Sequence, residues 1–126
     1  MNDPVAALAE ILNAELDVPV VGGSFTGTPP AVLVRAAGGG TLGSGYMPTI
    51  DARIDIRCWH DTDWEAMGLA SQIARLLHQL RDRQTGHGRV RWCRVEGFMS
   101  QLREPDTGWH AVLFTWQVYG DWLSDD

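Results

Sequence analysis

The segment Ile50-Asp51-Ala52-Arg53-Ile54-Asp55-Ile56-Arg57-Cys58-Trp59 alternates between two kinds of residue over ten positions. Because successive side chains of a β-strand point to opposite faces, this alternation predicts a strand with one face in the core and the other outside it. A slip of one residue would bring four charges into the core, so the register of the strand is strongly fixed. The face outside the core consists of Asp51, Arg53, Asp55, Arg57 and Trp59.

Two helices are predicted on either side of this strand. The first covers residues 4–14, where Asn2 or Asp3 can act as the N-cap and an apolar stripe follows. The second follows a capping box formed by Thr62 and Glu65, and its apolar residues recur at helical spacing. Both helices need tertiary packing to be stable, so each must cover a face of a sheet.

Three further segments have strand patterns: residues 31–36, 89–96 and 109–119. The elements predict one α/β domain of the α+β type over residues 1–126, in the order α-β-β-α-β-β. We expect a four-stranded, mainly antiparallel sheet with both helices on one face and the other face uncovered. A long glycine-rich loop, residues 38–48, connects the first two strands, and residues 97–108 connect the last two.

The charge of the chain narrows the classes of function. Sixteen carboxylates stand against ten basic residues, and the formal net charge is −6. A protein that wraps nucleic acid needs clustered positive charge, so this composition argues against such a surface. Every basic residue is an arginine, which excludes a P-loop lysine and a Schiff-base mechanism.

Both cysteines, Cys58 and Cys93, lie in predicted strands. The sequence shows neither a signal-peptide pattern nor an apolar run of membrane-spanning length. We therefore expect two buried free thiols in a protein made in the cytoplasm. A disulfide would need the two strands to be adjacent and in register, and this alternative stays open.

Two short motifs imitate functional signatures. Gly38, Gly40 and Gly43 match the dinucleotide-binding pattern, but the next element is a strand and not the helix whose N-terminus meets a pyrophosphate. Asp106-Thr107-Gly108 matches the core of the aspartic protease signature, but it follows Pro105 and no apolar strand leads into it. We interpret the first motif as a loop and the second as a turn.

No set of residues completes a catalytic or metal site. Cys58, His60 and Cys93 could lie near one another, but a second close pair of ligands is missing for structural zinc. Asp61 and Asp63 stand where the start of a helix favours carboxylates. The sequence therefore predicts no catalytic residue, no metal and no cofactor.

Six tryptophans are many for a chain of 126 residues. Some should lie at the periphery, where tryptophan is a common anchor of protein interfaces. Trp59 is the clearest candidate because it shares a face with four charges, and Trp122 near the acidic C-terminal end is the next. The alternative for both is local packing against a neighbouring loop.

Five segments follow one another over nearly the whole chain: Asp3-Pro4-Val5-Ala6-Ala7-Leu8, Pro30-Ala31-Val32-Leu33-Val34-Arg35, Asp55-Ile56-Arg57-Cys58-Trp59, Leu77-His78-Gln79-Leu80 and Leu102-Arg103-Glu104-Pro105-Asp106-Thr107-Gly108-Trp109. In this order they resemble the tail-terminator, or tail-completion, proteins of long-tailed bacteriophages. The last of the five segments is the most distinctive.

The resemblance implies a compact subunit that assembles in the host cytoplasm as a hexameric ring on the head-proximal end of the virion tail. Such a ring stops polymerisation of the tail tube and presents a surface for joining the head, without catalysis. The implied partners are further copies of the chain, the tail-tube protein and a head-completion or connector protein, with no membrane. DNA passes through the ring without specific binding, which fits the acidic composition.

Exposure and glycine content indicate which residues make the contacts. We expect residues 38–48 and parts of 97–108 to reach neighbouring subunits or the tube. The mixed charges of the 50–59 strand could pair with an adjacent subunit and orient it. The predicted contact residues are Leu42, Tyr46, Met47, Asp51, Arg53, Asp55, Arg57, Trp59, Arg103 and Trp122.

Two other classes remain open. Another head–tail connector component, such as a head-closure or adaptor protein, would also form a ring but would contact different neighbours. A small ligand-binding or enzymatic α/β domain would instead be a monomer or dimer whose melting temperature rises with its ligand.

Overall fold

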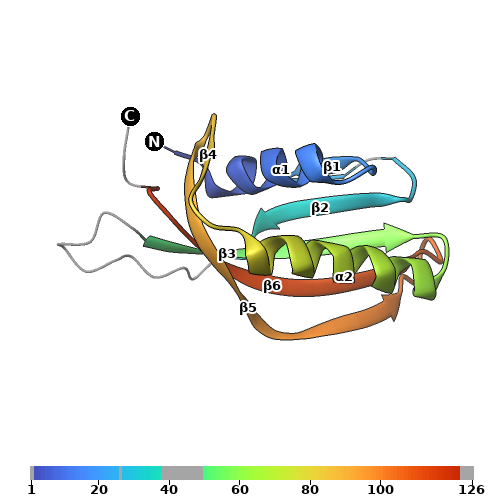
Figure 1. Cartoon of the computed structure of the whole chain (residues 1–126). Coiled ribbons are helices and arrows are strands. Elements are labelled where there is room, and N and C mark those ends of the chain that lie inside the picture. Colours follow the sequence, from blue (N-terminus) through green and yellow to red (C-terminus); the bar gives the residue numbers. More distant parts are fainter. Residues whose placement is uncertain (1, 26, 38–49, 123–126) are drawn as a thin grey trace.

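The computed structural model describes residues 2–25, 27–37 and 50–122, which form two helices and six strands (Figure 1). In chain order these elements are α1 (Pro4–Glu15), β1 (Val20–Gly22), β2 (Ala31–Ala36), β3 (Ile50–His60), α2 (Asp63–Gln79), β4 (Arg83–Thr85), β5 (Gly88–Arg103) and β6 (His110–Gly120).

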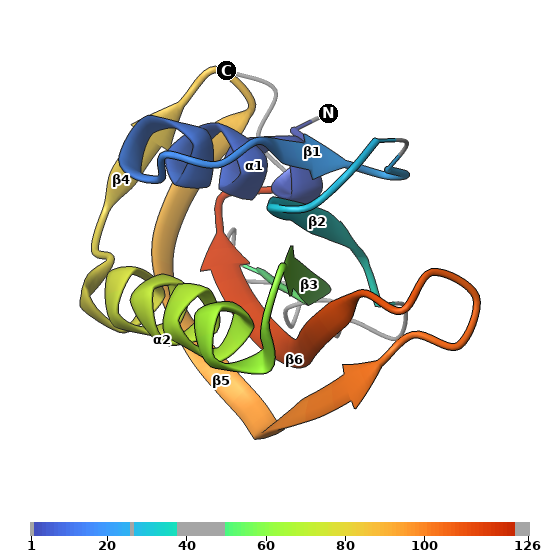
Figure 2. The same cartoon turned by 90° about the vertical axis from the view of Figure 1, so that its right-hand side faces the viewer.

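The strands form one sheet in the order β1-β2-β3-β6-β5-β4. β1 and β2 run parallel, and every other neighbouring pair runs antiparallel. β3 and β6 lie at the centre and pair from Ile50 opposite Gly120 to His60 opposite His110. Both helices lie on the same side of the curled sheet (Figure 2). The expected α+β domain with its helices on one face is therefore confirmed.

The expected count of four strands is wrong, because β1 and β4 extend the sheet at its two ends. Each has only three residues, which is too short to show a period. β1 follows Pro19 in a stretch that reads as a loop, and β4 covers Gln84 and Thr85, which read as part of a turn. Both strands are held by a longer neighbour, so tertiary pairing and not local preference makes them strands.

The predicted connection over residues 97–108 is also too long. β5 continues to Arg103, and its pairing with β6 shifts register between Glu96 and Ser100. Gly97 has φ +77°, a conformation that glycine adopts without strain. The shift is thus a bulge within a strand, and the glycine that suggested a loop is the residue that permits it.

The helices begin at the expected caps. Asp3 Oδ1 accepts hydrogen bonds from the backbone N–H groups of Val5 and Ala6 at 3.0 and 3.2 Å. Thr62 Oγ1 accepts one from the N–H of Glu65 at 3.1 Å. The apolar faces of both helices pack on the inner sheet face, and the largest fully buried side chains are Leu8, Leu12, Ile54, Ile56, Ile73 and Leu77.

Cys58 and Cys93 are buried free thiols, as expected. Their strands are not neighbours, because β6 lies between β3 and β5. Cys58 is opposite Val112 on β6, whereas Cys93 is opposite Val118. Burial raises the pKa of each thiol to about 12, so both are protonated at neutral pH.

Candidate assembly surface

The sheet face turned away from the helices carries the charged residues of β3. Arg53 donates from Nε and Nη2 to the two carboxylate oxygens of Glu96, at 3.0 and 2.8 Å. Because Glu96 belongs to β5, this bidentate pair crosses over β6, which lies between the two strands. The hydrogen bonds from Arg53 to Glu96 raise the pKa of the guanidinium, so it remains charged.

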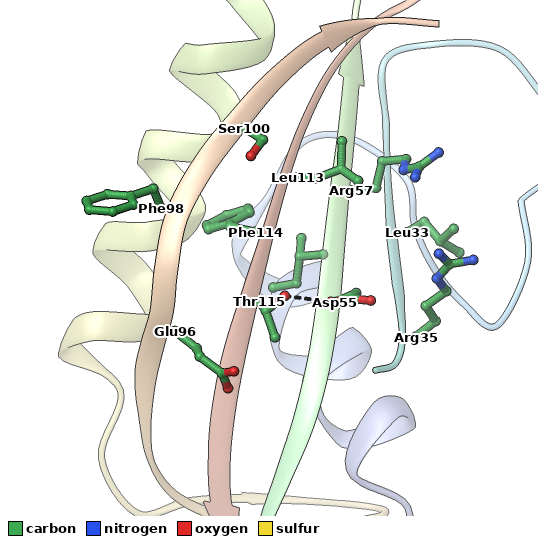
Figure 3. A pocket seen from close by; sticks show the side chains of 11 residues that line it. Leu33, Arg35, Asp55, Arg57, Glu96, Phe98, Ser100, Leu113, Phe114 and Thr115 are labelled. Carbon is green, nitrogen blue, oxygen red and sulfur yellow. Dashed lines mark hydrogen bonds between the residues drawn. The ribbon is translucent and has the colours of Figure 1, made fainter. Parts of the chain in front are cut away.

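A shallow pocket of about 170 Å³ lies on the same face (Figure 3). At its floor, Thr115 Oγ1 donates to Asp55 Oδ1 at 2.6 Å. Charged and apolar side chains from β2, β3, β5 and β6 meet here, including Arg35, Arg57, Glu96, Leu33, Leu113 and Phe98. The polar groups of the pocket floor are already paired with one another, so the pocket reads as part of an uneven surface.

One corner of this face is closed by aromatic side chains. Trp59 is only 5% exposed and stacks on Phe25 at 5.0 Å between ring centroids, with Trp109 at 6.1 Å. Glu104 Oε1 accepts from Trp59 Nε1 at 2.7 Å and from Arg57 Nη1 at 3.0 Å. The alternation of the strand placed Trp59 on the correct face, but the residue packs locally and does not protrude.

The remaining predicted contact residues within the described ranges do not form one cluster with Trp59. Leu42, Tyr46 and Met47 lie outside the described residues, as do Gly38, Gly40 and Gly43. Trp122 is 2% exposed and donates from Nε1 to the carbonyl oxygen of Val118, so it packs locally like Trp59. Arg103 is exposed at the end of β5 and donates to the carbonyl oxygen of Gly108 at 3.1 Å. Asp51 is half-buried on β3.

Most of the large exposed apolar side chains lie on β5, where Arg103 is the one contact residue predicted from the sequence. Of five such residues in the described part of the chain, four are on β5: Trp92, Val95, Phe98 and Leu102. Phe98 is 94% exposed and sits in the bulge. The sequence predicts a strand over residues 89–96 and contacts from parts of 97–108, but it does not show that these four side chains are exposed on one strand.

The Asp106-Thr107-Gly108 motif lies in a turn of the structure. The N–H of Gly108 donates to the carbonyl oxygen of Glu104 at 2.8 Å, which confirms the turn interpretation. Within the described ranges, one group could in principle hold a metal: His60, Asp61 and Glu65, with ligand atoms within 4.8 Å of one another. His60 Nδ1 already accepts the N–H of Asp61, and Glu65 accepts from its capping partner, so these contacts serve the start of α2.

Neither α1 nor α2, the helices in the described part of the chain, is long and apolar enough to cross a membrane.

Of the comparisons with known proteins, the one with solved structures gives a match. No family model matches the sequence, and no curated protein sequence matches it. The structure is similar to a chain of a particle described as "Virion of native gene transfer agent (GTA) particle", with a TM-score of 0.64 and 13% sequence identity. The similarity covers 93% of this chain and 93% of that chain, so the whole domain is shared and not a common substructure.

Proposed function

We propose that this chain is a structural virion protein. The observation that carries the proposal is the similarity to a virion chain over 93% of both proteins. Folds can host unrelated functions, so fold alone is a weak argument. Here the resemblance of five sequence segments to phage tail terminators points independently to the same kind of particle.

We further propose the tail-terminator role within the virion. In this role six copies form a ring on the head-proximal end of the tail tube, stop its polymerisation and offer a surface to a head-completion or connector protein. The excess of carboxylates suits a ring through which DNA passes, because it does not retain phosphates. The role requires no cofactor and no catalysis.

The charged face of β3 is proposed as part of the contact between subunits. Its charges are paired within the chain, since Arg53 binds Glu96 and Arg57 binds Glu104. Paired charges at an interface orient a partner more than they add affinity. We also propose that Leu42, Tyr46 and Met47 contact a neighbouring subunit or the tube; deletion of residues 39–45 should then abolish ring formation or tube capping.

Exchanging the charges of Arg53 and Glu96 distinguishes ion pairing within the chain from contact with a neighbouring subunit. Arg53→Glu alone places two carboxylates together and should weaken both folding and assembly. The double variant Arg53→Glu with Glu96→Arg restores an ion pair within the chain and keeps the net charge. If the face contacts a neighbour, the double variant should regain the thermal stability of the wild type and still form fewer rings. Rings in wild-type amounts would show that this face makes no contact between subunits.

Another head–tail connector component is the second candidate. The description of the similar chain names a virion particle but no position within it, so it is equally compatible with a connector component. The two are distinguished by mixing the purified chain with tail tubes and with tail-free heads. A terminator binds the tubes, whereas a head-side connector binds the heads.

A further inference from the structure

β5 has a long open edge. On one side it pairs with β6 as far as Arg103, but on the other it pairs with β4 only through Gly88, Arg89 and Val90. In the described part of the chain, no strand pairs with this side of β5 from Trp92 to Arg103. Figure 2 shows this length of β5 at the margin of the sheet, beyond β6. An open edge presents unpaired backbone donors and acceptors to any extended segment that meets it.

The pairing pattern identifies the groups that face outward. The N–H of Ala37 donates to the carbonyl oxygen of Arg53, so the peptide groups of Arg53 point away from β6. Alternation along the antiparallel ladders then directs the peptide groups of Glu96 toward β6, opposite Thr115. The peptide groups of Val95, one residue earlier, therefore point to the open edge.

The opposite edge of the sheet is blocked. β1 is the last strand there, and the side chain of Asn13 binds both backbone groups of Val20. Asn13 Nδ2 donates to the carbonyl oxygen at 2.9 Å, and Asn13 Oδ1 accepts from the N–H at 3.2 Å. An amide side chain thus occupies the position of a further strand, and among the described residues no side chain binds the backbone of Val95 in this way.

The open edge is also apolar, with a small excess of positive charge. Val95, Phe98 and Leu102 are 44%, 94% and 39% exposed. Residues 92–103 carry two arginines, Arg94 and Arg103, and one carboxylate, Glu96, whereas the other residues of the chain carry eight arginines and fifteen carboxylates. The rest of the molecule is therefore strongly acidic, so another copy of this chain offers β5 a surface of opposite charge.

We infer that the open edge of β5, residues 92–103 with Phe98 at its centre, binds a second copy of this chain head to tail. Two such edges side by side would have the same net positive charge, and neither would meet the acidic remainder of the other copy, which disfavours a symmetric pair. A head-to-tail contact instead places β5 against the acidic remainder of the neighbour and can close into a ring. The inference rests on the proposed ring for the number of copies, but not for the surface that it assigns.

Substitutions at Val95 and Phe98 test the two parts of this surface. Val95→Pro removes one outward N–H and no hydrogen bond to β6, since proline is tolerated where the N–H of an edge strand faces solvent. Val95→Thr is its matched control, because it keeps the N–H and the branched shape. Phe98→Ser removes the exposed ring, and Trp64→Ser removes an aromatic that is 84% exposed on α2 as its control.

The measurements are sedimentation velocity over a wide concentration range and amide hydrogen exchange of residues 92–103, on the full chain without any other protein. Association of the wild type should slow exchange at Val95. Val95→Pro and Phe98→Ser should each raise the dissociation constant at least about tenfold, while both controls and the thermal stability of all four variants stay near the wild type.

Three results would overturn the inference: a monomer at every concentration, an oligomer that leaves exchange at 92–103 unchanged, or association that stops at two copies. Failure of the proposed function is separate. A ring that caps tail tubes without protecting β5 would contradict the inference on β5 and leave the terminator role intact. An oligomer that forms through β5 but does not bind tubes would contradict the terminator role and leave the inference on β5 intact.

Discussion

At the scale of single residues, Glu104 joins the end of β5 to β3. It accepts hydrogen bonds from Arg57 and from the nearly buried indole of Trp59. Glu104→Ala leaves that indole N–H without its acceptor, and an unsatisfied buried donor costs about 1–3 kcal/mol. We expect a loss of this size in the free energy of unfolding, measured with urea.

The conservative variant separates the hydrogen bond from the charge. Glu104→Gln keeps an oxygen acceptor for Trp59 and removes only the charge that faces Arg57, which is partly exposed. Exposed ion pairs contribute about 0–1 kcal/mol, so this variant should lie near the wild type. Equal losses for the two variants would show that the indole hydrogen bond contributes nothing.

The buried thiols make stability depend on pH. Below the ordinary pKa of a thiol, Cys58 and Cys93 are protonated in both the folded and the unfolded chain, and the effect is zero. Their pKa is about 12 in the folded chain, so above the ordinary value only the unfolded chain loses these protons. The free energy of unfolding should therefore fall as the pH rises from about 8.5 toward 12.

Urea unfolding at several alkaline pH values measures this dependence. The variant with both cysteines replaced by alanine is the control, since its stability should fall less steeply over the same range. The thiols of the native wild type should also resist alkylation at pH 8 and react after unfolding. Rapid alkylation of the native protein would contradict the burial on which the prediction rests.

At the scale of elements, two glycines with opposite surroundings test the packing of α2 and of the end of β6. Gly68 is exposed in α2, and a Cβ there meets nothing within 4 Å. Gly68→Ala should stabilise the protein by about 0.5–1 kcal/mol, because alanine loses less backbone entropy in a helix. Thermal unfolding of the two proteins measures the difference.

Gly120, the last residue of β6, is the matched contrast. A Cβ there would come within 2.6 Å of the carbonyl oxygen of Arg89 and would also strike the ring of Trp122. Since backbone cannot give way cheaply, Gly120→Ala should destabilise the protein by about 1–3 kcal/mol. A neutral effect at Gly120 would mean that Trp122 does not pack over the end of β6.

The elements also show what the sequence could predict. α1, α2 and β3 were predictable because each carries a cap or a complete period, such as Asp3 at α1 and the alternation from Ile50 to Trp59. β1 and β4 were not, because three residues have no period and their pairing depends on β2 and β5. The second half of β5 was not predicted as a strand, because Gly97 is as typical of a turn as of a bulge.

On the candidate surface, too, features set by a local pattern were predictable, whereas features set by distant residues were not. The alternation correctly placed Asp51, Arg53, Asp55, Arg57 and Trp59 on the face away from the helices. It could not reveal that Glu96 and Glu104 lie across from Arg53 and Arg57, because these partners are 43 and 47 residues away in sequence. For the same reason Trp59 was expected at the periphery, whereas Phe25 and Trp109 cover it.

At the scale of the whole molecule, one acidic α+β domain shares its fold with a virion chain over nearly its full length. In the described part of the chain, one sheet edge is blocked by Asn13, and the other is open along an apolar, weakly basic length of β5. A subunit with one such edge and an acidic remainder has the asymmetry that a ring of identical copies needs.

Electron microscopy of the purified full-length chain, alone and mixed with tail-tube protein, tests the terminator role most directly. The account predicts six-fold rings seated on one end of the tubes, and tubes that stop growing once they are capped. A monodisperse monomer that leaves the tubes uncapped and still growing would contradict it.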